Sequence, residues 1–186
     1  ANKYAAGVSK RAHQPAKLAA IEGDWKTVTP APLVLFAWPD AARERNLYEI
    51  AIPVLGSLIL THSLDGKVVG LDAFAPADRP PVAIVFWTFR IMVGAGLAML
   101  LVAAFGAWLA WRRRLVEARW FLRLCVAASP LGWIAVLAGW YTAEVGRQPF
   151  IVYGLMRTAD AAAPVTGDKV LMSLIVFVLV YAAVFG

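Results

Sequence analysis

Two charged side chains follow directly after a long apolar stretch of this chain. Glu144 and Arg147 stand three residues apart, beyond an apolar run that extends from about 124 to 142. At this spacing both side chains share one helix face and can form a simple ion pair. A carboxylate in this position can instead bind a metal or relay protons, with the arginine balancing its charge. Trp140, four residues before Glu144, then packs on a flat cofactor or belongs to an interfacial aromatic belt.

A second pair lies in the sequence FWTFRIMVGAG. Met92 is a chemically suitable axial ligand for haem iron, and Arg90, two residues earlier, could pair with a haem propionate. Charged residues at membrane depth are costly and are usually paired or functional. The alternative is that Met92 fills a helix interface and that Arg90 extends its charged end to the membrane surface.

A third pair lies near the start of the chain, in the sequence QPAKLAAIEGDW. Lys17 and Glu22 are five residues apart and could bind a polar head group and accept its protons. They could equally form a solvated face. The two histidines, His13 and His62, have no cysteine or carboxylate pattern around them that would predict a metal site.

The elements that must position these side chains are membrane helices. Of the 186 residues, 61% are hydrophobic, compared with about 45–50% in soluble domains. Three stretches are long enough to cross a hydrocarbon core of about 30 Å as helices: 82–111, 121–142 and 170–186. The sequence therefore predicts an all-α integral membrane protein with about three transmembrane helices. The third stretch stops within an apolar run, which suggests a piece of a longer subunit.

The distribution of positive charge predicts how these helices are oriented. The net charge is +6, and much of it comes from arginines in and just after the short connection 112–120. Arg-rich short loops stay in the cytoplasm, so the region 1–81 and the loop 143–169 are expected on the periplasmic side of a bacterial inner membrane. Because the membrane explains the basic charge, no nucleic-acid partner is expected. The single cysteine, Cys125, excludes a disulfide within the chain.

The region 1–81 differs from the rest because prolines interrupt it repeatedly. Residues 17–25 could form a short helix that Gly23 closes. Residues 50–60 are apolar but too short to span, so an interfacial or re-entrant segment is expected there.

Three motifs, taken in their order and spacing, resemble subunit I of the cytochrome bd-type quinol oxidases. They are QPAKLAAIEGDW, FRIMVG and the segment from Gly139 to Pro149, which ends in Gly-Arg-Gln-Pro. The similarity covers essentially the whole chain and corresponds to the C-terminal part of that subunit. The short loop between Glu22 and the first span resembles the short-Q-loop, cyanide-insensitive-like branch.

The resemblance implies a helical membrane enzyme that oxidises ubiquinol at the periplasmic side and reduces dioxygen to water. It implies a low-spin haem b, a high-spin haem b and a haem d, or a third haem b, as cofactors. The enzyme would generate proton motive force without pumping. Its implied partners are the N-terminal part of the same subunit, subunit II, a possible small accessory subunit and the lipid bilayer.

The resemblance also assigns roles near the quinol. Lys17 and Glu22 match Q-loop positions linked to quinol binding and oxidation. Met92 matches the methionine that ligates the low-spin haem b iron, and Arg90 matches the arginine beside that haem.

Around the oxygen site, Glu144 matches the glutamate associated with the high-spin haem b iron, as a ligand or close neighbour. Trp140 and Arg147 match residues that line the same region. One departure is Phe150, which stands where the family commonly has tryptophan. His13 and His62 match none of the family's haem-ligating histidines, which lie mostly in N-terminal helices that this sequence lacks.

Two alternatives compete with the oxidase. A non-catalytic membrane protein, such as a transporter fragment or an assembly anchor with paired charges, would explain the charge pairs. Transporters usually show broken helices and inverted repeats, and no repeat is seen here. A cytochrome b with two histidine ligands per haem is disfavoured because the predicted spans contain no histidine.

Overall fold

The computed structural model describes residues 14–161 and 165–185. His13 lies outside the described residues. Three helical segments of the described chain are long and apolar enough to cross a membrane: 76–111, 119–146 and 167–185. This confirms the helical membrane class and the number of predicted spans. The first span contains helix α4, Val82–Trp111, which has the bounds expected from the sequence.

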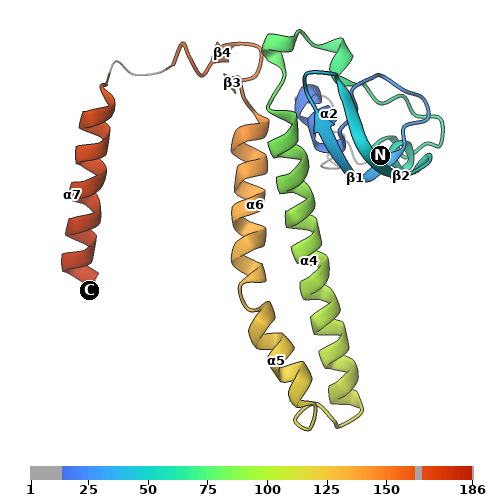
Figure 1. Ribbon diagram of the computed structural model, residues 1–186, viewed down its shortest axis with the longest axis vertical. Coiled ribbons are helices and arrows are strands. Elements are labelled where there is room, and N and C mark those ends of the chain that lie inside the picture. Colours follow the sequence, from blue (N-terminus) through green and yellow to red (C-terminus); the bar gives the residue numbers. More distant parts are fainter. Residues whose placement is uncertain (1–13, 162–164, 186) are drawn as a thin grey trace.

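The second span consists of two helices, α5 (Arg119–Ala128) and α6 (Leu131–Gly146). They are separated at Ser129 and Pro130 because proline has no backbone N–H to donate to a preceding helical turn. Together they run antiparallel to α4 (Figure 1). The Arg-rich turn, residues 112–118, joins the end of α4 to the start of α5. A polar contact within this hairpin ties α6 to α4, since Thr142 Oγ1 lies 2.9 Å from Thr88 Oγ1.

The third span is α7, Gly167–Phe185. It stands apart from the α4–α6 hairpin (Figure 1), and all its residues are exposed. An apolar helix whose residues are all exposed is expected to face lipid or other helices.

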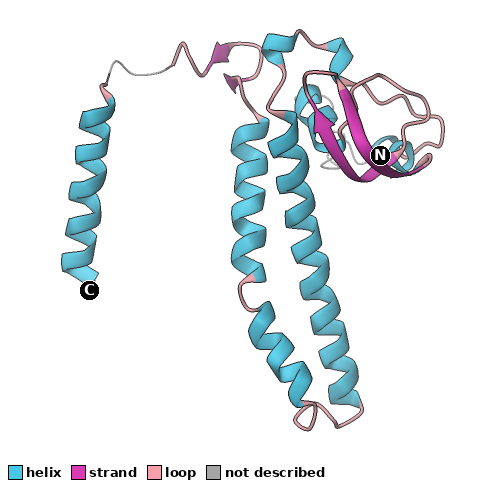
Figure 2. Cartoon of the chain, in the orientation of Figure 1, coloured by secondary structure: helices cyan, strands magenta, loops and turns pink. Residues whose placement is uncertain are grey.

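The region before α4 folds into a cap at one end of the hairpin (Figure 2). Its α2 helix covers Pro15–Glu22 and ends at Gly23, whose φ of 78° is left-handed and whose N–H donates to the Ala19 carbonyl at 2.9 Å. This is the short, glycine-closed helix that the sequence predicts. A side chain at Gly23 would also collide with the Phe86 ring.

The cap contains a β-hairpin, which differs from the all-α fold that the sequence predicts. Strand β1 (Leu33–Asp40) pairs antiparallel with β2 (Arg45–Ile52), with Leu33 opposite Ile52 and Asp40 opposite Arg45. Two register shifts interrupt the pairing. The irregular register and the proline within β1 weaken the alternating pattern by which strands are recognised in a sequence.

The apolar segment 50–60 divides between two elements. Its first residues end β2, and most of the remainder belongs to the short helix α3, Leu55–Thr61. Ser57 is buried, and its Oγ accepts a hydrogen bond from the Ala31 N–H at 2.6 Å. This bond fixes α3 against the segment that leads into β1. Ile50, Leu58 and Ile59 are exposed, so an interfacial position for this segment stays a prediction.

A buried apolar cluster fastens the cap to the ends of α4 and α6. The 3-10 helices η1 (Leu71–Ala73) and η2 (Pro76–Asp78) connect the cap to α4. The cluster combines residues from α2, the loop after it, η1 and α4, with partly buried neighbours on α4 and α6: Ala19, Ala20, Ile21, Trp25, Leu71, Val82, Val85, Phe89 and Val145. Burial of apolar side chains is the main force that holds such contacts together.

After α6 the chain forms a small hairpin from β3 (Phe150–Val152) and β4 (Met156–Arg157). Arg157 forms an ion pair with Asp78 of η2. Its guanidinium carbon also lies 5.2 Å from the centre of the Phe150 ring. These contacts fix the loop that follows Gly-Arg-Gln-Pro to the lead into α4.

Candidate functional site: charged groups where the cap meets α4 and α6

Arg90 is the centre of the contact between the cap and α4. Its guanidinium donates to the carbonyls of Ile21 at 2.7 Å, Leu35 at 3.1 Å and Phe86 at 3.1 Å, and also to that of Val34. It also stacks on the Phe86 ring, with the guanidinium carbon 3.3 Å from the ring centre. These bonds join α2, β1 and α4. The side chain thus binds cap carbonyls and does not simply extend to solvent.

Met92 lies one half-turn further along α4 and faces α6. A Cβ atom on Gly139 would stand 2.9 Å from the Met92 sulfur, so the missing side chain at Gly139 makes room for the thioether. Met92 is partly buried at this helix contact. The structure therefore brings Met92 next to Gly139, the first residue of the third motif.

Lys17 connects the cap helix to the end of α6. Its Nζ donates to the Ala143 carbonyl at 3.2 Å. The methylene carbons of Lys17 lie 3.0–3.3 Å from the position that a Cβ on Gly146 would occupy. Lys17 is thereby held beside the backbone on either side of Glu144.

Glu144 and Arg147 form an ion pair with each other. Their side chains are 40% and 41% exposed, and pairs of this kind contribute about 0.3–0.5 kcal/mol. Trp140, which is 57% exposed, stacks edge-on against Tyr141. The simple pairing predicted as one alternative is thus formed, and most of the Trp140 surface stays open.

Glu22 ends α2 and is buried, with 7% of its surface exposed. Burial raises the pKa of its carboxyl group, and the positive charge of Arg90 partly offsets this rise. Lys17 and Glu22, which the sequence predicts to act together, lie on the same short helix but have different neighbours. Lys17 contacts α6, and Glu22 lies next to the Arg90 cluster.

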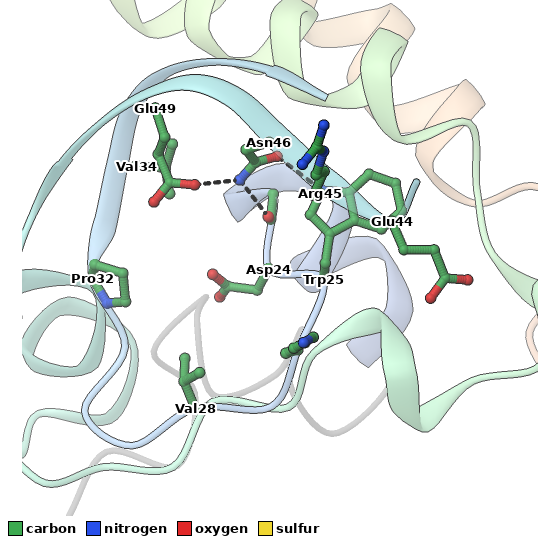
Figure 3. A pocket seen from close by; sticks show the side chains of 11 residues that line it. Asp24, Trp25, Val28, Pro32, Val34, Glu44, Arg45, Asn46 and Glu49 are labelled. Carbon is green, nitrogen blue, oxygen red and sulfur yellow. Dashed lines mark hydrogen bonds between the residues drawn. The ribbon is translucent and has the colours of Figure 1, made fainter. Parts of the chain in front are cut away.

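Two residues beyond Glu22, Asp24 is a buried carboxyl group that the sequence analysis did not single out. Its pKa is raised to about 7, mainly by burial and further by the charges of Glu22 and Glu49, while the charge of Arg90 acts in the opposite direction. Asp24 borders a cavity between the end of α2 and the β-hairpin (Figure 3). A short acidic residue after a helix-ending glycine resembles an ordinary turn, so the sequence carried no signal for its burial.

The polar tie between Thr88 and Thr142 and the ion pair between Asp78 and Arg157 were also missed. Threonines inside apolar helices do carry a recognisable signal, because a buried hydroxyl needs a hydrogen-bond partner. Asp78 and Arg157 are 79 residues apart in the chain, so no local sequence pattern predicts that they pair.

The described residues contain no group of three or more His, Cys, Asp or Glu side chains that could hold a metal ion. Haem iron needs fewer protein ligands, and a thioether is a suitable one. Met92 has the right donor atom for this role, and its sulfur packs closely against Gly139 on α6. No histidine lies in α4, α5, α6 or α7, so a second axial histidine would have to come from outside these helices. His62 is exposed at the end of α3.

The fold and these side chains define a class: a multi-pass helical protein of a bacterial membrane, with a charged cap over the ends of two helices. The family model of cytochrome bd terminal oxidase subunit I matches residues 4–186. The chain belongs to this family, as the three motifs indicated, and cytochromes are haem proteins.

Relatives of known sequence and structure agree. The chain is 39% identical to cytochrome bd ubiquinol oxidase subunit 1 of Bacillus subtilis (strain 168), over 90% of this chain and 38% of the relative. It is 32% identical to cytochrome bd-II ubiquinol oxidase subunit 1 of Escherichia coli (strain K12), over 90% of this chain and 46% of the relative.

Among solved structures, the bd oxidase from Geobacillus thermodenitrificans superposes with a TM-score of 0.75 at 35% identity, covering 95% of this chain and 40% of that chain. This chain therefore spans less than half the length of each of these relatives.

Proposed function

We propose that this chain is part of a terminal respiratory quinol oxidase in the bacterial inner membrane. In this proposal the enzyme oxidises ubiquinol at the periplasmic side, reduces dioxygen to water and generates proton motive force without pumping. The chain supplies its cap and helices to an assembly that includes the N-terminal part of the same subunit, a second subunit and a possible small accessory subunit.

One observation carries the proposal. The cap helix with Lys17 and Glu22 is packed on the two helices that bear Met92 and Glu144. A quinol head group bound at the cap would thus lie near a haem ligated through Met92. Groups held in one place react far faster than free ones.

The residue roles in this proposal are those that the family resemblance implies. Lys17 and Glu22 would bind the quinol head group, and Glu22 would accept a proton from it. Met92 would hold the iron of the low-spin haem b from the side of α4. Arg90 would keep the cap in place beside that haem. Of its five N–H groups, four already reach carbonyls, which leaves at most one for a propionate.

Glu144, with Arg147 balancing its charge, would serve the iron of the high-spin haem b as a ligand or close neighbour, and Trp140 would line that haem. When bound, the haems, including a haem d or a third haem b, would supply the electron transfer and the reduction of dioxygen. The competing function is a non-catalytic membrane protein, which the observed Glu144–Arg147 pair alone would favour.

The test is a reduced-minus-oxidised absorbance spectrum of the assembled complex with Met92→Leu, measured together with quinol oxidation. We expect the low-spin haem b band to shift or disappear and the rate to fall at least about tenfold. Met99→Leu is the matched control, because Met99 is an exposed methionine two turns along the same helix. An unchanged spectrum and rate for Met92→Leu would refute the ligand role and favour the paired-charge alternative.

A further inference from the structure

Asp24 is a buried acid that none of the roles above uses. Its side chain is 6% exposed, and Oδ2 has no hydrogen-bond partner within residues 14–161 and 165–185. Its backbone is fixed from both sides, since the N–H donates to the Ala19 carbonyl and the carbonyl accepts from Leu71. A buried acceptor without a partner costs free energy, so its presence calls for an explanation.

The Asp24 carboxyl group points into a cavity of about 240 Å³, in the space between Val28, Pro32 and Glu49 (Figure 3). This volume is ample for water. The cavity reaches the surface, because it is also lined by exposed charged residues. These are Lys26, Glu44, Arg45 and Glu49.

The neighbouring polar groups are already occupied. Asn46 donates to Glu49 at 2.8 Å and to the Gly23 carbonyl at 3.0 Å, and it accepts from the Trp25 indole at 2.8 Å. These bonds hold the end of α2 against β2 and keep the cavity walls in place. The Asp24 carboxyl group thus borders the cavity, and these neighbours make no hydrogen bond to its Oδ2.

We propose that Asp24 takes protons from Glu22 and releases them into this cavity, from which they reach the outer surface. This inference rests on the proposed function, in which Glu22 accepts protons from quinol. Glu22 is itself buried, so a proton that it receives needs a route out before the next turnover. Asp24 is the acid nearest to it in the chain, and it borders solvent-accessible space.

The step is a proton transfer alone. An O–H bond on the Glu22 carboxyl group breaks as one forms on Asp24, Glu22 returns to its carboxylate form, and no electron moves. The proton then passes from Asp24 to water in the cavity. A relay group functions best when its pKa lies close to the working pH, and a value of about 7 meets this condition. The charges that face Asp24 are those of Glu22 on α2, Glu49 on β2 and Arg90 on α4.

The experiment compares the assembled oxidase with its Asp24→Asn variant. We expect quinol oxidation to fall about tenfold or more, while the haem spectrum is unchanged. In the wild type the rate should rise with pH through about 7 as Asp24 loses its proton and can accept another. This rising limb should be absent from the variant. Asp65→Asn is the control, because Asp65 is exposed in a turn that asparagine also suits.

A second measurement does not depend on turnover. Infrared titration of the resting complex should show a protonated carboxyl band that disappears near pH 7 and is missing in Asp24→Asn. Glu49→Gln removes a negative charge that faces Asp24, so the midpoint of this band should move to lower pH. Glu49→Gln also keeps the relay testable if Asp24→Asn does not assemble.

The outcomes separate the relay from the proposed function. An active wild type whose Asp24→Asn variant has the same rate, pH profile and infrared band overturns the relay and leaves the quinol oxidase intact. A wild-type complex without quinol oxidation overturns the proposed function and the relay with it.

Discussion

At the scale of single residues, Arg90 makes more contacts with the cap than its position in an apolar helix indicates. Arg90 makes four hydrogen bonds to backbone carbonyls from three elements and stacks on Phe86. A guanidinium is planar and carries its donors in a fixed fork, which a lysine ammonium cannot reproduce. We therefore expect Arg90 to hold the cap against α4.

We expect Arg90→Lys to lower the free energy of unfolding by about 2–3 kcal/mol, because several charge-assisted bonds are lost together. Thermal unfolding of the purified complex in detergent measures this, and faster proteolysis of the cap should accompany it. Arg43→Lys is the control, since the Arg43 side chain is 65% exposed and its Nε lies 3.8 Å from Asp40 Oδ2. This substitution should change the free energy of unfolding by no more than about 0.5 kcal/mol. Equal stability of the two variants would show that the carbonyl contacts do not hold the cap.

At the scale of elements, the α4–α6 hairpin is held by a small polar contact within an apolar surface. Thr142 is 5% exposed, and its hydroxyl bonds both to Thr88 and to the Ala138 carbonyl. Hydrogen bonds between membrane helices average only about 0.6 kcal/mol. Their value here lies in fixing the helix register, and this register sets Met92 opposite Gly139.

A double-mutant cycle tests this contact. Thr142→Val and Thr88→Val should each destabilise the complex by about 0.5–1.5 kcal/mol. The double variant should lose less than the sum, because the two hydroxyls share one bond. Unfolding in a denaturing detergent gives the three free-energy differences. Strict additivity would mean that the two hydroxyls do not interact.

At the scale of the whole molecule, the charges and the fold agree on one arrangement. The cap and the loop after α6 lie at the same end of the α4–α6 hairpin, and the Arg-rich turn lies at the other (Figure 1). The positive-inside rule places that turn in the cytoplasm. The cap would then face the periplasm, and protons released from quinol there, as proposed above, would contribute to the proton motive force.

Cysteine labelling in intact cells tests this orientation in the full-length subunit, with Cys125 replaced by alanine. A cysteine at Asp65 in the cap should react with a membrane-impermeant maleimide. The variant Glu117→Cys, in the Arg-rich turn, should react only after the membrane is permeabilised. The reverse pattern would place the cap in the cytoplasm and contradict the proposed site of quinol oxidation.

The sequence by itself determined the class of protein, the three apolar spans and the family. Hydrophobic length is a local property, and a helix of about 20 apolar residues satisfies its own backbone in lipid. The bounds of α4 and the glycine that ends α2 were predictable for the same reason. The motifs around Lys17, Met92 and Glu144 could be recognised because each is a short run of residues.

Only the tertiary structure decided how these motifs meet. The β-hairpin of the cap depends on pairing between strands with an irregular register, and the cavity beside Asp24 depends on how that hairpin lies against α2. The four carbonyls around Arg90 come from residues up to 69 positions away in the chain. Burial of Asp24, and with it the raised pKa, arises because distant segments exclude water from a carboxyl group. Local sequence carries no information about such packing.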